Sequence, residues 1–402
     1  MPASLTTFDS ILKEDYLGPI REQINESTVL MSRLEKNEED VGGKKAIVPL
    51  HTGRNSGVGA RAAGGTLPTA GNQQYENAEY NCKYNYARIQ VDGPTMKAAR
   101  KDKYAFVRAV DSEIQGATKD LKDDINRQLH LDGTGVLALV NGNPDGTSKV
   151  LTMDTPGTMY LSKGMKLDIV DPASVTAGDA RDNATNITVV AKSTALTATM
   201  LANVHADVAD NDLIVRYGNY LYEMMGLKGI VSDADPTNLT VGGIARATAG
   251  NEFWKANVVS NSGVARKLTL DLMQTAEDLA EEEGGEISLI LTSRTQRRKY
   301  LALVKADGRF VNTLKLDGGF TGLEYNEKPL VVDRHCYPGR MYFLDETSLA
   351  LYRMADIDWM QEDGAILSRV SGSDAYEAVL FYYATLGSRA CNKNALLTDL
   401  IV

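Results

Sequence analysis

The sequence has 402 residues, a formal net charge of −10 and a hydrophobic content of 43%. A chain of this length and composition can bury a sizeable core and has room for about two or three domains. Phosphate backbones require clustered lysine and arginine, so the acidic balance argues against nucleic-acid binding as a main activity. The three cysteines, Cys82, Cys336 and Cys391, have no CxxC spacing, which argues against a disulfide framework and against a thiolate metal site.

The first 40 residues predict an N-terminal arm. They lack the basic and apolar blocks of a signal peptide, and no run approaches the ~18 apolar residues of a membrane span. We therefore expect synthesis in the cytoplasm and no membrane partner. Two short amphipathic helical patterns occupy residues 5–40, one through Phe8 and Ile11 and one through Ile24 and Leu34. Such an arm either packs on its own domain or lies along a neighbour, and the sequence leaves both alternatives open.

Residues 46–82 are the most informative stretch for function. They contain no lysine, and the part between Leu50 and Tyr75 is rich in glycine and almost free of apolar side chains. Such a segment has little with which to fold against its own chain, so its order has to come from another molecule. This pattern favours an assembly protein over an enzyme.

Residues 97–131 predict one long helix, because apolar side chains recur there every three or four residues. At a rise of 1.5 Å per residue the helix is about 45 Å long. We expect one side of it to be buried and the opposite side to face water. The residues expected on the water side are Lys119, Lys122, Asp123 and Asp124.

Residues 155–217 predict a small inserted β subdomain. Short runs rich in β-branched residues are separated by Asp, Asn, Gly and Pro turns, as in a chain of short strands. The expected strands cover residues 166–170, 187–191, 196–200 and 213–217.

After residue 250 the patterns alternate between helix and strand, which indicates an α+β layer. A helix over residues 268–279 precedes a strand over 287–291, and a capping box of Ser293 and Gln296 opens the next helix. A strand over 376–386 is apolar on both faces, which places it centrally in its sheet. The other expected strands cover residues 329–333, 341–344 and 349–352.

No set of residues predicts catalysis or a cofactor. His51, His130, His205 and His335 are scattered without the spacing of metal ligands, and neither a P-loop nor a GxSxG elbow occurs. The basic run from Arg297 to Lys299 is typical of a solvated helix face more than of a partner contact. We therefore expect no enzyme activity, no cofactor and no metal.

The order of these parts resembles the major capsid protein of tailed bacteriophages, the fold named after phage Hong Kong 97. The resemblance is strongest in the last third of the chain, in residues 322–333, then 341–345 with 349–352, and then the aromatic strand that ends at 387–389. It implies an α+β chain with an extended β-hairpin loop, a long spine helix, and peripheral and axial α/β domains. The implied divisions are an N-terminal arm (1–42), the extended loop (43–96), the spine helix with the start of the peripheral domain (97–154), the inserted β subdomain (155–222), the axial domain (223–345) and the peripheral strands with the C-terminal segment (346–402).

The resemblance also implies a function and partners. Identical chains would form the hexamers and pentamers of an icosahedral shell that encloses double-stranded phage DNA without binding it specifically, and the chain would reside in the virion capsid. It further implies a separate scaffolding protein or a processed chain, a portal and a decoration protein. The type member cross-links a loop lysine to an asparagine of a neighbour, but the loop here has no lysine between His51 and Cys82, so that chemistry is expected to be absent despite Asn392 and Asn394.

Aromatic and basic side chains are the predicted contacts between subunits. The tyrosines after the glycine-rich segment are expected to become rigid anchors on assembly, and single tryptophans are typical of core or interface positions. The predicted interface residues are Arg54, Arg61, Tyr75, Tyr80, Tyr84, Tyr86, Trp254 and Trp359.

Other functions remain open at this point. A nanocompartment shell of the encapsulin kind would share the fold and enclose an enzyme instead of a genome. An α/β enzyme with a β appendage is another alternative, because the pattern after residue 266 also suits half of a doubly wound sheet, although the glycine-rich turn of such sheets is missing. A tail or adhesin protein is a third, against which the long helix argues.

Overall fold

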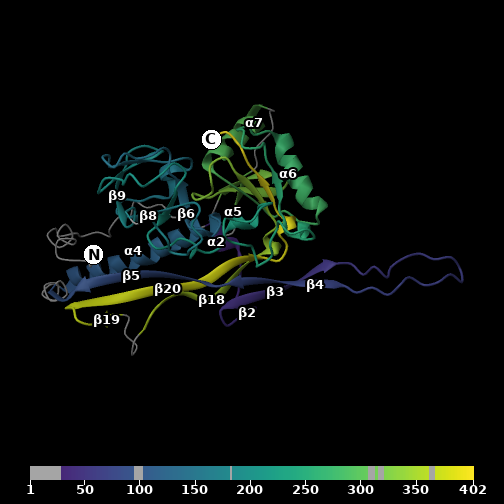
Figure 1. Cartoon of the computed structure of the whole chain (residues 1–402), viewed down its shortest axis with the longest axis horizontal. Helices are drawn as coiled ribbons and strands as arrows, with labels where there is room; N and C mark the ends of the chain where they lie inside the picture. Colours follow the sequence, from purple (N-terminus) through teal and green to yellow (C-terminus); the bar gives the residue numbers. More distant parts are fainter. Residues whose placement is uncertain (1–28, 95–102, 182, 307–312, 316–320, 362–366) are drawn as a thin grey trace.

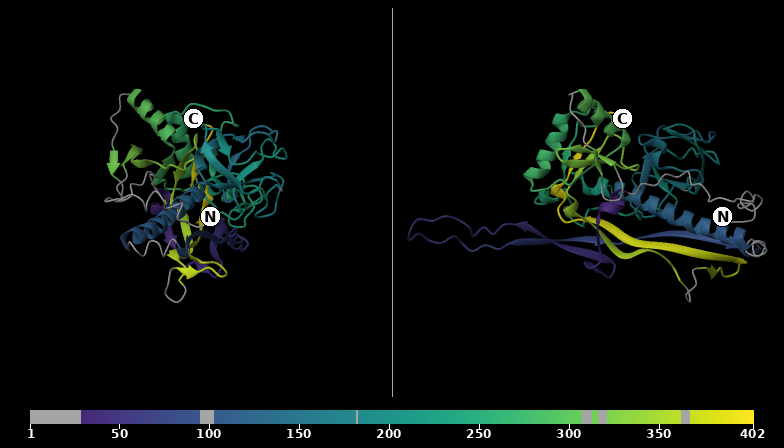
Figure 2. Two further views of the ribbon diagram at one scale, coloured as in Figure 1. Left: turned by 90° about the vertical axis from the view of Figure 1, so that its left-hand side faces the viewer. Right: turned by 180° about the vertical axis from the view of Figure 1, so that it is seen from behind.

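The computed structural model describes residues 29–94, 103–181, 183–306, 313–315, 321–361 and 367–402. The first predicted N-terminal helix, and residues 97–102 of the predicted long helix, lie outside these ranges. The described chain is elongated, with two lobes on one side of a long layer of strands and a hairpin that projects far beyond them (Figures 1 and 2).

A long helix and a long sheet form the body of the molecule. Helix α4 (Lys103–His130) runs beside strands β5 (Lys83–Asp92) and β20 (Ala375–Ser388), as both views show (Figures 1 and 2). The predicted long helix is thus confirmed over its described part, which is about 42 Å long. Strand β20 pairs with β5 along one edge and with β18 (Leu349–Trp359) and β19 (Ser368–Arg369) along the other. The predicted central position of this strand is therefore confirmed.

The projecting hairpin consists of β3 (Lys45–Gly53) and β4 (Gln74–Asn81), with β2 (Val41–Gly42) alongside its base. We call this hairpin, residues 45–81, the arm; it is distinct from the predicted N-terminal arm. Strand β4 continues almost directly into β5, so the arm and the body sheet are formed by one continuous stretch of chain. Strand β1 (Glu35–Asn37), which follows the short helix α2 (Val29–Arg33), pairs in parallel with β18 and so holds the N-terminal side on the body.

The first lobe is a small β-barrel, which covers the segment where short strands were predicted and begins before it. Its strands follow the order β6-β11-β8-β9-β10-β7, and an antiparallel bridge between Val140 and Met153 joins the first strand to the last. Its interior is apolar, with Leu167, Ile169 and Ile214 among its fully buried side chains. The strands are β6 (Val136–Leu139), β7 (Val150–Thr152), β8 (Lys166–Val170), β9 (Ile187–Lys192), β10 (Thr197–Met200) and β11 (Leu213–Arg216), with the 3-10 turn η1 (Gly157–Tyr160) between β7 and β8.

The second lobe is a mixed sheet covered by two helices. Helices α6 (Leu270–Glu282) and α7 (Arg294–Ala306) pack on the same face of the sheet, since Met273 and Tyr300 share one apolar cluster with Ile290 and Phe343. The other face of the sheet joins the core of the body, and the strand order is β12-β21-β17-β13-β16-β15-β14. Its strands are β12 (Asn257–Val259), β13 (Leu289–Thr292), β14 (Thr313–Lys315), β15 (Thr321–Tyr325), β16 (Lys328–Val332), β17 (Met341–Leu344) and β21 (Ala395–Leu397).

Short helical turns connect these parts. They are α5 (Leu227–Ile230), η2 (Glu252–Trp254), η3 (Glu346–Ser348) and η4 (Cys391–Lys393). The three cysteines are buried and free, as their spacing suggested. Among the described residues no helix combines the length and the apolar character that crossing a bilayer requires.

Two details of the predicted elements were wrong. The capping box is only half formed, because the Ser293 hydroxyl accepts from the Gln296 amide at 3.5 Å while the Gln296 side chain donates to the carbonyl of Ile401. Asp123 and Asp124 do not face water, since their side chains are 27% and 14% exposed and are held by arginines.

Candidate subunit interface

The base of the arm is anchored by an alternating pattern of side chains. In β3 the side chains of Ala46, Val48 and Leu50 are buried while those between them are exposed, and in β4 Ala78 and Tyr80 continue the same pattern. Because successive side chains of a strand point to opposite faces, one face of the hairpin joins the core of the body. Beyond these positions the hairpin leaves the body.

The tip of the arm, residues 54–73, projects into solvent (Figure 1). Its two large apolar side chains, Val58 and Leu67, are 85% and 81% exposed. Arg54 and Arg61 are the only charged residues between Gly53 and Tyr75, and both are exposed. The Arg61 guanidinium donates to the carbonyls of Thr66 and Ala60, so the internal bonds of the tip are local. The tip therefore exposes polar backbone, two cations and isolated apolar groups to solvent.

The two sides of the tip approach each other at glycines. A Cβ atom on Gly71 would lie 2.4 Å from the hydroxyl oxygen of Ser56, and one on Gly57 would lie 3.0 Å from the carbonyl oxygen of Thr69. Side chains at these two positions would force the sides of the arm apart. The glycines therefore allow the two sides of the hairpin to lie close together, in addition to making the backbone flexible.

An exposed aromatic cluster continues from the arm onto the body sheet. The rings of Tyr84 and Tyr86 on β5 lie edge-on to Tyr383 on β20, with centroids 5.0 and 5.7 Å apart, and Phe381 lies 5.0 Å from Tyr383. Tyr84 and Tyr86 remain 48% and 54% exposed. Partial burial and the neighbouring tyrosine hydroxyls raise the pKa of Tyr383 to about 12. These rings form a rigid apolar surface on the side of the sheet facing away from α4, because Asn85, between them in β5, bonds to Gln128 of α4.

The predicted interface residues thus fall into two groups. Arg54, Arg61, Tyr75, Tyr84 and Tyr86 are exposed, and Tyr75, which is 70% exposed, lies against the ring of His51 at 5.4 Å. They remain available for contact with another chain.

Three of the predicted interface residues are buried to different degrees by contacts within their own chain. They are Tyr80, Trp254 and Trp359. Trp254 is 1% exposed and donates its indole N–H to the carbonyl of Val241, and Trp359 is partly buried against the body core. Tyr80 is 3% exposed, and its hydroxyl donates to the carbonyl of Ser388 at 2.8 Å and accepts from that residue's amide at 3.0 Å. Burial raises the pKa of Tyr80 well above its ordinary value. Tyr80 and Trp254 fix the arm base and the core, so we do not include them among the proposed contacts.

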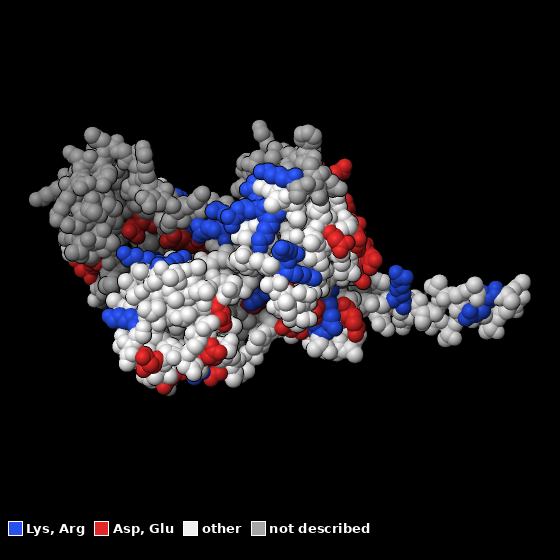
Figure 3. All heavy atoms as spheres, turned by 90° about the horizontal axis from the view of Figure 1, so that it is seen from above, with Lys and Arg blue, Asp and Glu red and all other residues white. Residues whose placement is uncertain are grey.

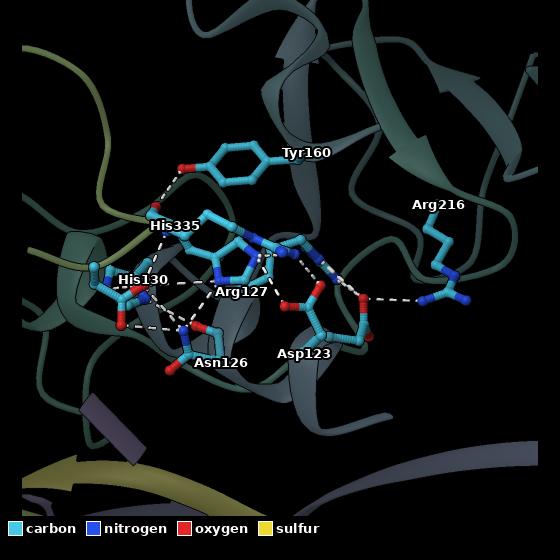
Figure 4. A network of polar contacts seen from close by, with 10 residues as sticks. Asp123, Asn126, Arg127, His130, Tyr160, Arg216 and His335 are labelled. Carbon is cyan, nitrogen blue, oxygen red and sulfur yellow. Dashed lines mark hydrogen bonds and ion pairs between the residues drawn. The ribbon is translucent and has the colours of Figure 1, made fainter. Parts of the chain in front are cut away.

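A buried ionic junction joins the long helix to both lobes (Figure 4). Arg127 of α4 donates to both carboxylate oxygens of Glu223, at 2.9 and 2.6 Å, and to Asp124 at 3.0 Å. Arg216 of the barrel reaches the same Asp124 at 2.9 Å. Burial alone would raise the pKa of Asp124, but the two arginines outweigh burial and lower it to about 2. The barrel is therefore tied to the helix by the ion pair of Arg216 with Asp124.

The second half of the junction contains two histidines that are far apart in the sequence. His130 and His335 have ring centroids 6.2 Å apart, and Asn126 donates to Asp333 at 3.1 Å and contacts Nδ1 of His335 at 3.0 Å. Tyr160 of the barrel donates to the carbonyl of His335 at 2.8 Å. Burial, and next the nearby His130, lower the pKa of His335 to about 3, so its ring is neutral near neutral pH. This cluster connects the helix, the barrel and the end of β16 through hydrogen bonds.

The junction consists of ion pairs and hydrogen bonds between different elements. Within the described ranges no group of three or more His, Cys, Asp or Glu side chains could hold a metal ion. The carboxylates of the junction accept hydrogen bonds from arginines, from Asn126 and from the backbone amide of His335. The residues connect the helix to the barrel and to the segment that follows β16.

Sequence patterns missed the junction because its partners come from distant parts of the chain. The histidines were read as scattered, and Asp123 and Asp124 as solvated. One local feature of the sequence indicated the junction. The last turns of α4 carry the polar residues Asn126, Arg127 and His130, whereas a surface helix would alternate polar with apolar residues there. Buried polar residues at that density indicate a site where several elements meet.

Comparison with known proteins supports the fold. No protein-family model matches the sequence, and neither does any curated protein. Among solved structures, the capsid asymmetric unit of cyanophage A-1(L) is similar with a TM-score of 0.59 at 15% identity, covering 97% of this chain and 98% of that one. An encapsulin complex from Synechococcus elongatus is similar with a TM-score of 0.51 at 8% identity, covering 98% of this chain and 95% of that one.

The predicted resemblance is thus confirmed at the level of the fold. The chain is a mixed α+β protein with the fold of a phage capsid protein over nearly its whole length.

Proposed function

We propose that this chain is a structural shell protein that assembles into hexamers and pentamers and encloses double-stranded phage DNA. The arm is the observation that carries the proposal. A hairpin anchored at its base by Ala46, Val48 and Tyr80 extends a tip with exposed Val58 and Leu67 beyond its own chain. A fold shared with a capsid protein over 97% of the chain supports the same conclusion.

The parts of the chain correspond to roles in such a shell. We assign α4 as the spine helix, the sheet of β5, β18 and β20 as the peripheral layer, and the lobe with α6 and α7 as the axial domain. The β-barrel is an insertion, which we place on the outer surface or at a contact between subunits. The ionic junction around Arg127 and His335 would set the angle between these parts, and small differences in such angles decide how a shell curves.

The contacts of the arm are noncovalent in this account. The tip has two arginines and no lysine, so it would lie on a neighbouring chain through its backbone, Arg54, Arg61 and the exposed tyrosines. The net charge of −10 supports a wall that does not hold packaged DNA tightly. In this account the chain is made in the host cytoplasm, works with a scaffolding protein, a portal and a decoration protein, and performs no catalysis.

A second function has one specific observation in its favour. The fold is also similar to that of an encapsulin complex, so a nanocompartment shell would use the same architecture. Nuclease-resistant DNA inside purified particles distinguishes the two: its presence supports a phage shell, and protein cargo without DNA supports a nanocompartment.

The arm can be removed without disturbing the register of its strands. Gly53 pairs with Gln74, so replacing residues 54–73 by Asn-Gly gives a two-residue turn between strands that already pair. We expect this variant to fold, as judged by circular dichroism, but to form no closed shells by electron microscopy. The wild-type chain serves as the control, and the variant Arg54→Ser with Arg61→Ser, which keeps the arm, tests separately whether its two cations contribute to the contact.

The outcomes separate the role of the arm from the role of the chain. Closed particles of normal size from the shortened chain would contradict the proposed role of the arm. A wild-type chain that stays monomeric or dimeric under every condition would contradict the shell function itself.

A further inference from the structure

Helix α6 exposes a stripe of carboxylates. Residues 270–286 contain seven acidic residues and no basic one. Asp271, Asp278 and Glu282 lie on its exposed face, and Glu283 and Glu286 follow it in exposed positions. Glu277 and Glu281 are paired with Lys328 within the chain. The other five have no cationic partner among the described residues.

Helix α7 exposes a stripe of cations. Residues 294–305 contain five basic residues and no acidic one. Arg294, Arg298 and Lys305 are exposed, and Arg297 is partly exposed. None of these four forms an ion pair with a described residue. The amine of Lys299 donates to the carbonyl of Ile401.

The two stripes lie on different sides of one lobe. Both helices cover the same face of the sheet, α6 over β12 and β21 and α7 over β16. Seen from above, Lys and Arg gather on one side of this lobe and Asp and Glu on the other (Figure 3). The lobe therefore has complementary charges facing in different directions.

Each helix carries part of its stripe at the end where that charge is unfavourable, while Asp271 at the start of α6 and Lys305 at the end of α7 are favourably placed. The C-terminal end of a helix favours cations, yet α6 ends on Glu281 and Glu282 without a basic residue in its last turn. The N-terminal end favours anions, yet α7 begins with Arg294, Arg297 and Arg298 without an acidic residue in its first turn. Charges that oppose the preferred sign at a helix end, on two helices of one lobe, indicate that these charges contact another molecule.

We propose that the acidic stripe of α6 binds the basic stripe of α7 on an adjacent copy of the same chain. The stripes face different directions (Figure 3), and the rings of the proposed shell need a contact that repeats around an axis. The contact is therefore head-to-tail, and repeated contacts of this kind close into a ring. The proposal rests on the proposed shell function and names the residues that join neighbours within one capsomer.

Charge reversal tests the contact without weakening the helices. The α6 variant combines Asp278→Lys with Glu282→Lys, and the α7 variant combines Arg294→Glu with Arg298→Glu. Each change near a helix end places the favourable sign there, so folding should be retained. The matched control reverses two exposed cations of the barrel, Lys149→Glu and Lys163→Glu.

Assembly is followed by sedimentation and electron microscopy at low ionic strength. We expect each single-helix variant to need at least about tenfold more protein for half-assembly, because like charges then face each other. The control assembles as the wild type does. A chain carrying both pairs of changes regains assembly, because the contact is complementary again with its signs exchanged.

A mixture of the two single-helix variants gives the sharpest result. Alternating copies restore opposite charges at every contact, which is possible in a ring of six and impossible in a ring of five. We expect the mixture to form hexamers, tubes or flat sheets and no closed shells. If the wild type assembles and the single-helix variants assemble equally well, this inference is wrong while the shell function stands. If the wild type forms no rings or shells at all, the shell function is wrong and the inference falls with it.

Discussion

Replacing Arg127 by methionine is expected to cost far more stability than removing an exposed ion pair. The Arg127 guanidinium is 4% exposed and makes two bonds to Glu223, whose side chain is 1% exposed. Burial alone would lower the pKa of Arg127, but the carboxylates of Asp124 and Glu223 outweigh it and raise the pKa. Removing one partner leaves a buried carboxylate without compensation, which costs about 3–5 kcal/mol.

This loss of free energy of unfolding can be converted into a decrease in melting temperature. With an unfolding entropy of about 2.1 cal/mol/K per residue, a chain of 402 residues that unfolds as one unit loses about 4–6 °C. Lys45→Met is the control, because Lys45 and Glu79 form an ion pair of 2.7 Å with side chains 32% and 47% exposed. Such an exposed pair contributes less than about 1 kcal/mol.

The assay is thermal unfolding of the dispersed chain, followed by circular dichroism. A third variant, Arg127→Met with Glu223→Leu, removes both charges. It should recover most of the stability that Arg127→Met loses, since replacing a buried ion pair by apolar residues often changes the free energy of unfolding little. If Arg127→Met loses no more than Lys45→Met does, the junction does not hold the lobes as described. If the double variant is no more stable than the single one, the loss does not come from an unpaired carboxylate.

Three further predictions concern the junction and the arm base. His335 should make the fold acid-sensitive: its pKa is lowered to about 3, so the unfolded chain binds a proton that the folded chain excludes, and stability falls as the pH drops below 6.5, by about 2 kcal/mol at pH 5. Urea unfolding at pH 7 and pH 5 measures this, and an unchanged slope in His335→Gln would contradict the assignment. Tyr80→Phe should cost about 1–3 kcal/mol in the same assay, because it leaves the buried backbone of Ser388 unpaired, and no loss would show that water replaces the hydroxyl. Gly387→Ala should also cost about 1–3 kcal/mol, since its Cβ would lie 2.7 Å from the Tyr352 ring and 2.8 Å from the Tyr80 ring, and a neutral effect would show that both rings move aside freely.

Elements defined by local periodicity were predictable from the sequence. The strand at 376–386, the long helix and the barrel strands each repeat apolar residues at the spacing of their own secondary structure, and the structure confirms them as β20, α4 and β8 to β11. The composition of the glycine-rich segment predicted that it does not fold against its own chain, because it lacks apolar residues to bury, and its extended form was implied by the resemblance.

Features that depend on tertiary contacts were not predictable. Arg127 and Glu223 lie on different elements, and nothing in the spacing of either residue indicates that they meet. Tyr80 was grouped with the exposed tyrosines by its position after the loop, but the two-residue alternation of β4 places it on the buried face. Asp124 lies where a helix surface would face water, and only the packing of the barrel beside the helix brings Arg216 to it.

The most direct test of the shell function is electron microscopy of the wild-type chain, expressed alone and together with a scaffolding protein. Our account predicts closed shells, tubes or capsomer rings in at least one of these preparations. A uniformly monomeric or dimeric protein in all of them would contradict it.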